Sequence, residues 1–342
     1  MKNTNRIQWL DSCKGFAIIL VVIGHMEKGI NTAGLFPEQF DVLNAIDRCL
    51  YSFHMPLFWM LAGYTFYLAY CKNRDERRDS FKKQLINSVY VYFLFSTIQW
   101  SIQYAFSGYI NTHVTFYDLL LSPIRPMSPY WFTFVLIFYY LFFYYFIRLK
   151  LPETVKLLII AVLSALGNPL DLDIVIPIRI LLLHMLFFYL GIYFAKSGSM
   201  IADSKLAFSV LSILGVLALG ICTATKPPYV PLLTDVLVPS LIGLLFFNLF
   251  YKLSFIGSSR FLQIIGKYSL EIYVIHCILT AGVRVILSKL GVNNCWLMLV
   301  IGTVLSVSLP MLWAFIIKRL KIYNYFFKPT ALFKKADAKK VM

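Results

Sequence analysis

Charged residues are scarce in this chain of 342 residues, since Asp, Glu, Lys and Arg make up only 14% of it. Average soluble domains carry roughly a quarter charged residues. The six cysteines show no CxxC spacing, and neither an HExxH motif nor paired carboxylates are present. No metal is therefore expected, and the low share of charged residues excludes a disulfide scaffold. The chain also has no internal repeat and no low-complexity segment.

Hydrophobic residues are abundant instead, at 59% of the chain, with 17% aromatic residues and a mean hydropathy of +0.73. This composition excludes a disordered protein and indicates a polytopic membrane protein. The net charge of +16 would suggest nucleic acid in a soluble protein. In a membrane protein, basic residues instead gather in cytoplasmic connections, so no nucleic-acid partner is expected.

Apolar runs long enough to cross a hydrocarbon core of roughly 30 Å predict an all-α fold with about ten transmembrane helices. Most of the 32 lysines and arginines fall in connections that share one side, and Arg284 is among the few on the other. This asymmetry predicts that both termini are cytoplasmic. Residues 1–320 are expected to form the membrane domain and 321–342 a basic cytoplasmic tail. The predicted spans lie near 11–29, 48–70, 85–107, 129–147, 154–168, 177–195, 206–224, 233–251, 269–287 and 296–317.

Ionisable residues within such spans are costly and indicate functional sites. Lys14 and His25 are eleven residues apart in the first span, so they point from one helix face about 16 Å apart. This geometry suits a long ligand with anionic groups at one end and a reacting centre at the other. In the alternative interpretation, Lys14 reaches to lipid headgroups and His25 caps the helix end.

The second span contains His54 beside Pro56. Pro56 lacks a backbone donor, which frees the carbonyl of Ser52 to be satisfied by a neighbour or by cavity water. His54 is expected at a depth similar to that of His25, where the two imidazoles could converge. Packing of His54 on an aromatic helix is the alternative.

In the ninth span, Ser269, Tyr273 and His276 form one polar stripe, and Glu271 lies elsewhere on the helix. His276 is expected to be buried enough to contact a substrate. His184 lies in the middle of another span, where an interhelical hydrogen bond is its expected role, and His113 lies in a loop.

Residues 122–132 read SPIRPMSPYWF, in which three prolines prevent a regular helix. Arg125, Tyr130 and Trp131 would suit a polyanionic or sugar acceptor at the outer face. The two aromatic residues are equally expected in an interfacial belt.

These residues resemble the acyltransferase 3 family of integral membrane acyltransferases, over about residues 6–320. The similarity rests on residues 9–11 (Trp-Leu-Asp), Lys14, His25, 53–58 (Phe-His-Met-Pro-Leu-Phe), 62–63 (Ala-Gly), 130–132 (Tyr-Trp-Phe), and 269–276 with its Ser-Leu, Tyr and His. The family commonly has Arg at the position of Lys14, and Lys is similar to a branch related to fucose 4-O-acetylases. It often has Ser where this chain has Ala62.

The resemblance implies a multi-pass protein of a bacterial-type inner membrane that uses acetyl-CoA to O-acetylate a sugar of a surface polysaccharide or its lipid-linked precursor. Together with the helix geometry, it assigns residues to three roles. His25 and His54 would be catalytic, with His25 acting as a general base or accepting the acyl group itself. The coenzyme would bind Lys14, Arg74, Arg77 and Arg78; the acceptor would bind Arg125, Tyr130, Trp131 and His276.

Two other functions fit a chain of this composition. A transporter or flippase of a lipid-linked sugar also uses intramembrane histidines and Pro-broken helices, although such folds usually show paired interrupted segments in two halves. A structural membrane subunit would not need three histidines within spans. The sugar, the acyl group and the oligomeric state leave no trace in the sequence.

Overall fold

A computed structural model of the protein describes residues 6–72, 74–109, 114–167, 176–224 and 233–332. Within these ranges the chain is helical, without strands, which agrees with the predicted all-α fold. The helices are α1 (Gln8–Thr32), α2 (Phe40–Tyr51), α3 (His54–Phe66), α4 (Arg74–Ala105), α5 (Phe116–Leu120), α6 (Trp131–Phe146), α7 (Glu153–Leu166), α8 (Ile176–Leu183), α9 (Met185–Ser197), α10 (Lys205–Ala224), α11 (Val238–Lys252), α12 (Ser254–Gly257), α13 (Arg260–Lys267), α14 (Ser269–Lys289), α15 (Cys295–Arg319) and α16 (Tyr323–Phe327).

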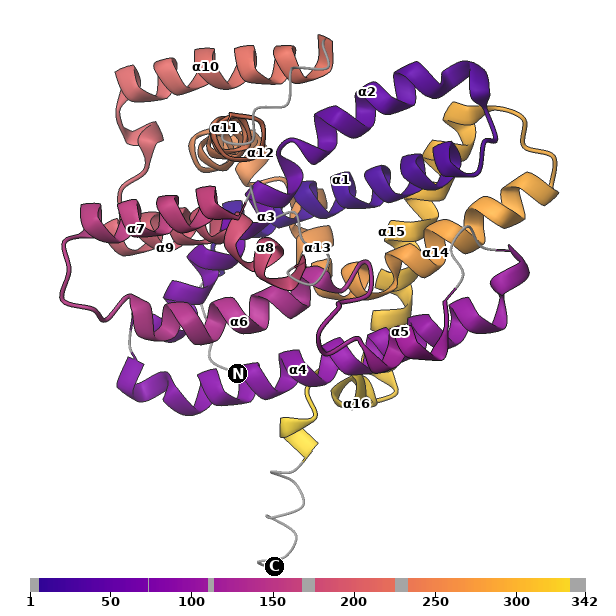
Figure 1. The fold of residues 1–342 in the computed structure, drawn as a ribbon, viewed down its shortest axis with the longest axis horizontal. Helices are drawn as coiled ribbons and strands as arrows, with labels where there is room; N and C mark the ends of the chain where they lie inside the picture. Colours follow the sequence, from indigo (N-terminus) through magenta and orange to yellow (C-terminus); the bar gives the residue numbers. More distant parts are fainter. Residues whose placement is uncertain (1–5, 73, 110–113, 168–175, 225–232, 333–342) are drawn as a thin grey trace, which may run out of the picture.

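Six helical segments in the described part of the chain are long and apolar enough to cross a membrane. They confirm several apolar spans, while the count of ten and the orientation of the termini stay predictions. α1, α4 and α10 begin at the left of Figure 1 and run to the right. We call the end where α1 begins the inner end and the end where it finishes the outer end, after the predicted orientation. The six segments are Gln8–Thr32, Ile178–Ser197, Lys205–Cys222, Thr234–Lys252, Ser269–Lys289 and Cys295–Arg319.

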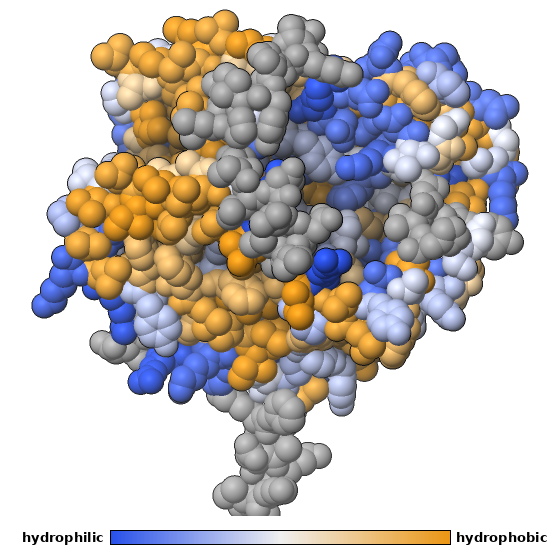
Figure 2. Space-filling view, viewed as in Figure 1, coloured by the Kyte–Doolittle hydropathy of each residue, from blue (hydrophilic) through white to orange (hydrophobic). Residues whose placement is uncertain are grey.

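The outer surface of the helix bundle is apolar. On α10, Leu206, Val210, Ile213 and Leu217 recur at helical spacing and are all exposed. Figure 2 shows hydrophobic residues gathered over α6, α7, α9 and α10, and hydrophilic ones over α2. Exposed apolar stripes of this extent would be unfavourable in water and are typical of lipid-facing helices.

Small residues let the central helices pack closely. A methyl group added to Gly63 on α3 would overlap the backbone carbonyl of Phe188 on α9, and one added to Gly15 on α1 would overlap that of Leu262 on α13. Close backbone approach of this kind is how helices associate in lipid, where no hydrophobic force drives them together. Gly63, part of the family-like Ala-Gly pair, therefore has a packing role.

The predicted span 48–70 is not one helix. α2 ends at Tyr51, and α3 starts at His54. Pro56 falls in the first turn of α3, where a missing backbone donor costs no helical hydrogen bond. The prediction of a break beside His54 is confirmed, but the residues before the break belong to a separate helix.

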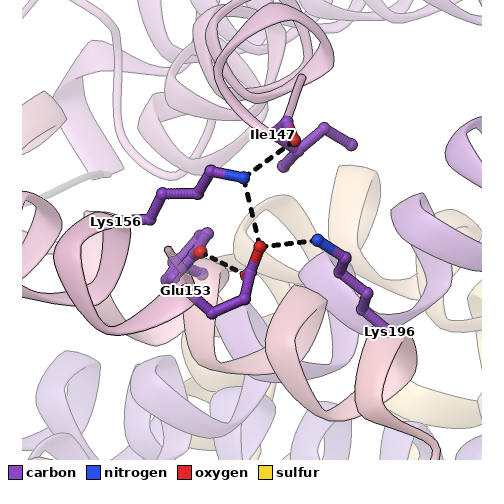
Figure 3. A network of polar contacts seen from close by, with 5 residues as sticks. Ile147, Glu153, Lys156 and Lys196 are labelled. Carbon is purple, nitrogen blue, oxygen red and sulfur yellow. Dashed lines mark hydrogen bonds and ion pairs between the residues drawn. The ribbon is translucent and has the colours of Figure 1, made fainter. Parts of the chain in front are cut away.

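Charges between α7 and α9 are fully partnered (Figure 3). Lys156 is buried, and its Nζ lies 3.1 Å from Oε1 of Glu153 and 3.1 Å from the carbonyl oxygen of Ile147. Lys196 lies 2.6 Å from the same carboxylate oxygen, and the Tyr189 hydroxyl donates to its other oxygen at 2.9 Å. This network ties the start of α7 to α9.

Candidate active site

A cavity of about 730 Å³ lies along α1 and is lined by both Lys14 and His25. The prediction that these side chains share one helix face is therefore confirmed. No ion pair or hydrogen bond of the Lys14 ammonium is found within the described ranges, and its carboxylate neighbour Asp11 pairs with Arg6 at 3.0 Å. Lys328 also lines this cavity, which we call the inner cavity.

The ring next to His25 is that of His276, with the ring centroids 4.8 Å apart. Nδ1 of His276 lies 2.6 Å from the carbonyl oxygen of Tyr273. A carbonyl can only accept, so Nδ1 carries the proton and Nε2 presents a lone pair. The expected convergence was with His54, whereas the ring contact found for His25 is with His276 on α14.

His54 lines the inner cavity as well. Its Nδ1 hydrogen-bonds to the carbonyl oxygen of Leu50, and its ring lies edge-on to that of Tyr51 at 4.7 Å between centroids. The carbonyl fixes the proton on Nδ1 and leaves Nε2 as an acceptor. His54 therefore satisfies the carbonyl of Leu50, at the break before α3, while remaining beside the cavity.

The thiol of Cys277 lies close to the rings of both His25 and His276. Its Sγ lies 3.4 Å from Nε2 of His276, and one ligand atom from each of the three residues lies within 4.8 Å of the others. Such a nitrogen and sulfur set is of the type that binds Zn²⁺. The expectation of no metal came from sequence spacing alone and did not anticipate this cluster.

A second cavity, of about 820 Å³, adjoins the first along the end of α1, where His25 and Lys28 line both. We call it the outer cavity because it is built from the last turns of α1, α4 and α14. Its cationic residues are Lys28, Arg284 and Lys289. Two substrates can therefore approach the same imidazole through different spaces.

Two of the three arginines predicted to bind the coenzyme, Arg77 and Arg78, lie outside both cavities. Arg77 donates to the carbonyl oxygens of Leu68 and Ala69, at 2.6 and 3.1 Å, and so caps the end of the helical segment that follows α3. Arg77 and the exposed Arg78 line neither cavity, and the side chain of Arg74 lies outside the described residues.

Only two of the four residues predicted to bind the acceptor line a cavity. Trp131 and His276 line the inner cavity. Tyr130 is buried and donates to the carbonyl oxygen of Val274 at 2.8 Å, so it connects α6 to α14. Arg125 is exposed and lines neither cavity.

His184 lines the inner cavity, and its buried Nδ1 has no hydrogen-bond partner in the described part of the chain. The expected interhelical hydrogen bond is therefore not found at this atom. The ring stacks on Trp59, with the centroids 5.8 Å apart. His184 interrupts the predicted span 177–195 between α8 and α9, and His113 lies outside the described residues. Residues 180–188 contain neither proline nor glycine, so the sequence offered no signal for this break.

The acyltransferase domain model matches residues 7–316, nearly the whole chain. The chain belongs to the acyltransferase 3 family. No curated protein and no solved structure was found to match it. The family match makes the protein a membrane acyltransferase, and the cavities that meet at His25 are its candidate active site.

Proposed function

We propose that the protein is an O-acetyltransferase that moves an acetyl group from cytoplasmic acetyl-CoA to a sugar hydroxyl of a surface polysaccharide or its lipid-linked precursor. The proposal includes the bacterial-type inner membrane and the branch resembling fucose 4-O-acetylases. The observation that carries it is a cation and an imidazole on one helix, about 16 Å apart, facing one cavity.

The donor occupies the inner cavity. Its phosphates bind the ammonium of Lys14, for which the described residues provide no ion pair because the nearby Asp11 pairs with Arg6, and Lys328 adds a second charge at this cavity. Its pantetheine arm follows α1 and brings the thioester to His25. The predicted contributions of Arg74, Arg77 and Arg78 would be limited to the basic surface around the entrance.

The acceptor hydroxyl lies between the thioester and His25, which acts as a general base. The hydroxyl oxygen attacks the thioester carbonyl and its proton moves to the imidazole. The bond from the carbonyl carbon to sulfur then breaks, giving the acetyl ester and a thiolate that takes up the proton. Direct transfer is favoured over an acyl-histidine because the two cavities let both substrates bind together.

Neighbouring side chains position these groups. His276 contacts the ring of His25 and would orient it, and His54 would share or relay the proton. Trp131, which was predicted to contact the acceptor, lines the inner cavity and would instead contact the acyl end of the donor. Tyr130 supports α14 through its bond to Val274, and Arg125 would act only at the surface.

The test compares wild type, a deletion and His25→Ala in a host that makes the cognate surface glycan. Ester-linked acetate on the glycan should fall at least about 100-fold in both mutants, as expected for loss of a general base. The level of His25→Ala protein in the membrane is the control. If deletion leaves acetylation unchanged while glycan precursor accumulates on one side of the membrane, the protein is a transporter instead.

A further inference from the structure

Basic side chains line the outer cavity, and one of them, Arg284, has no partner among the described residues. No aspartate or glutamate is among its described lining residues, while three cations are. Beside His25 and Cys277, the lining offers amides and hydroxyls from Thr32, Gln99, Gln103 and Thr280. A cavity of this size and lining favours an anionic ligand rich in hydroxyl groups.

Arg284 is the most informative of these cations. It is only 7% exposed, its Nε has no hydrogen-bond partner, and no ion pair to it is found in the described ranges. A buried guanidinium without a partner is strongly unfavourable. Its planar donors match the two oxygens of a carboxylate or phosphate.

The position of Arg284 on α14 determines how far the anionic group of a ligand would lie from the hydroxyl at His25. Cys277, Thr280 and Arg284 follow one another at spacings of three and four on α14, and all line the outer cavity. The two turns between Cys277 and Arg284 rise about 10 Å, and the adjacent His276 ring contacts His25. The guanidinium and the imidazole are thus separated by a length on the order of one or two sugar rings.

Gly29 on α1 makes room for the arginine. A Cβ atom at this position would lie 3.4 Å from Nε and 3.6 Å from Cδ of Arg284. The side chain therefore lies flat against α1, on the helix that carries His25. Lys28, the neighbour of Gly29, lies 5.3 Å from the ring centroid of Tyr51 and also lines the outer cavity.

We propose that the acceptor carries an anionic group, a phosphate or a carboxylate, which Arg284 binds while a sugar hydroxyl of the same molecule lies at His25. This inference rests on the proposed function and narrows its substrate class. A sugar phosphate, a lipid-linked sugar pyrophosphate and a uronic acid share the required chemistry.

Binding of defined probes tests the proposal without any acetyl transfer. The thermal unfolding midpoint of the purified full-length protein would be measured with glucose 1-phosphate, glucuronic acid and methyl glucoside. A ligand that binds only the folded state raises this midpoint. At least one charged probe should stabilise the wild type and the Lys14→Gln variant, whereas the neutral probe should not. Whether the phosphate or the carboxylate probe acts distinguishes the two sources of charge.

Arg284→Gln should abolish this stabilisation, and Arg284→Lys should weaken it, because lysine keeps the charge but loses the bidentate geometry. Arg319→Gln, at an exposed arginine outside both cavities, should leave it unchanged. Without probe, Arg284→Gln should unfold no earlier than wild type, since it removes a buried charge without a partner.

Stabilisation that persists without Arg284, is lost in Lys14→Gln, or is equal for the neutral probe would overturn the inference. So would a lack of stabilisation by every probe. Failure of the proposed function would be seen separately, as unchanged glycan acetylation after deletion.

Discussion

Two buried cations of this protein have opposite surroundings. Lys156 lies between a carboxylate and a backbone carbonyl at 3.1 Å each, whereas no partner of the Arg284 guanidinium is found in the described part of the chain. Both are less than 10% exposed. Lys156 lines neither cavity, and Arg284 lines the outer one. Of these two buried cations, the partnered one ties helices together, and the one without a partner in the described residues faces a space that a ligand can enter.

The same distinction applies at the inner end. Lys318 pairs with the buried Glu271 at 3.0 Å, and the hydroxyl of Tyr323 donates to that carboxylate at 3.1 Å. α16 thereby packs on α14 and α15, so the packed structure continues beyond residue 320, where a tail was expected to begin. Lys14, in contrast, has no ion-pair partner among the residues that the structure describes, and it faces the inner cavity.

Among substitutions of partnered and unpartnered cations, the largest effect on activity is expected at Lys14. Lys14→Ala should raise the KM for acetyl-CoA by about 10- to 100-fold, because a hydrogen bond to a charged group contributes roughly 1.5–3 kcal/mol. Lys14→Arg should retain most of the affinity, since it keeps the charge that binds phosphate. Steady-state kinetics with purified protein would measure both.

Lys318→Ala is the matched control for Lys14→Ala, because this lysine has a carboxylate partner and lines neither cavity. It should leave the KM for acetyl-CoA unchanged and lower only the stability. An equal rise in KM for both variants would show that general surface charge, and not Lys14, attracts the coenzyme.

A smaller effect is expected at the partnered cluster. Glu153→Gln should destabilise the protein by about 1–2 kcal/mol, measured by denaturant unfolding in detergent, and leave kcat unchanged. Removing one partner of a fully buried pair costs roughly 3–5 kcal/mol, but the Glu153 side chain is 33% exposed.

The pH dependence of the unfolding free energy tests whether the ionised Glu153 carboxylate is the source of this stability. Burial raises the pKa of Glu153, whereas hydrogen bonds from Lys196, Lys156 and Tyr189 lower it. The lowering is larger than the rise, so the pKa lies below its ordinary value. The stabilisation is therefore complete above the unfolded-state pKa of about 4.3 and is lost as the pH falls through the lower folded-state pKa. Glu153→Gln should lack this dependence, and a variant that keeps it would contradict the assignment.

The sequence predicted the functional face of α1 because helical periodicity relates Lys14 to His25 within one unbroken element. It could not predict that His276 lies against His25, because that contact depends on how α1 and α14 pack. Arg284 was expected only as an outer cation, since no local pattern tells a buried arginine from an interfacial one. Tyr130 illustrates the reverse case: an apparent interfacial residue whose hydroxyl is used within the fold.

The central claim is that an inner and an outer cavity meet at His25, so that donor and acceptor reach it from opposite sides. The most direct test uses sealed proteoliposomes with labelled acetyl-CoA outside and an anionic sugar acceptor inside. We predict labelled acetate on the enclosed acceptor with wild-type protein, and at least about 100-fold less with His25→Ala. Acetylation that occurs only when both substrates share one compartment would contradict the account.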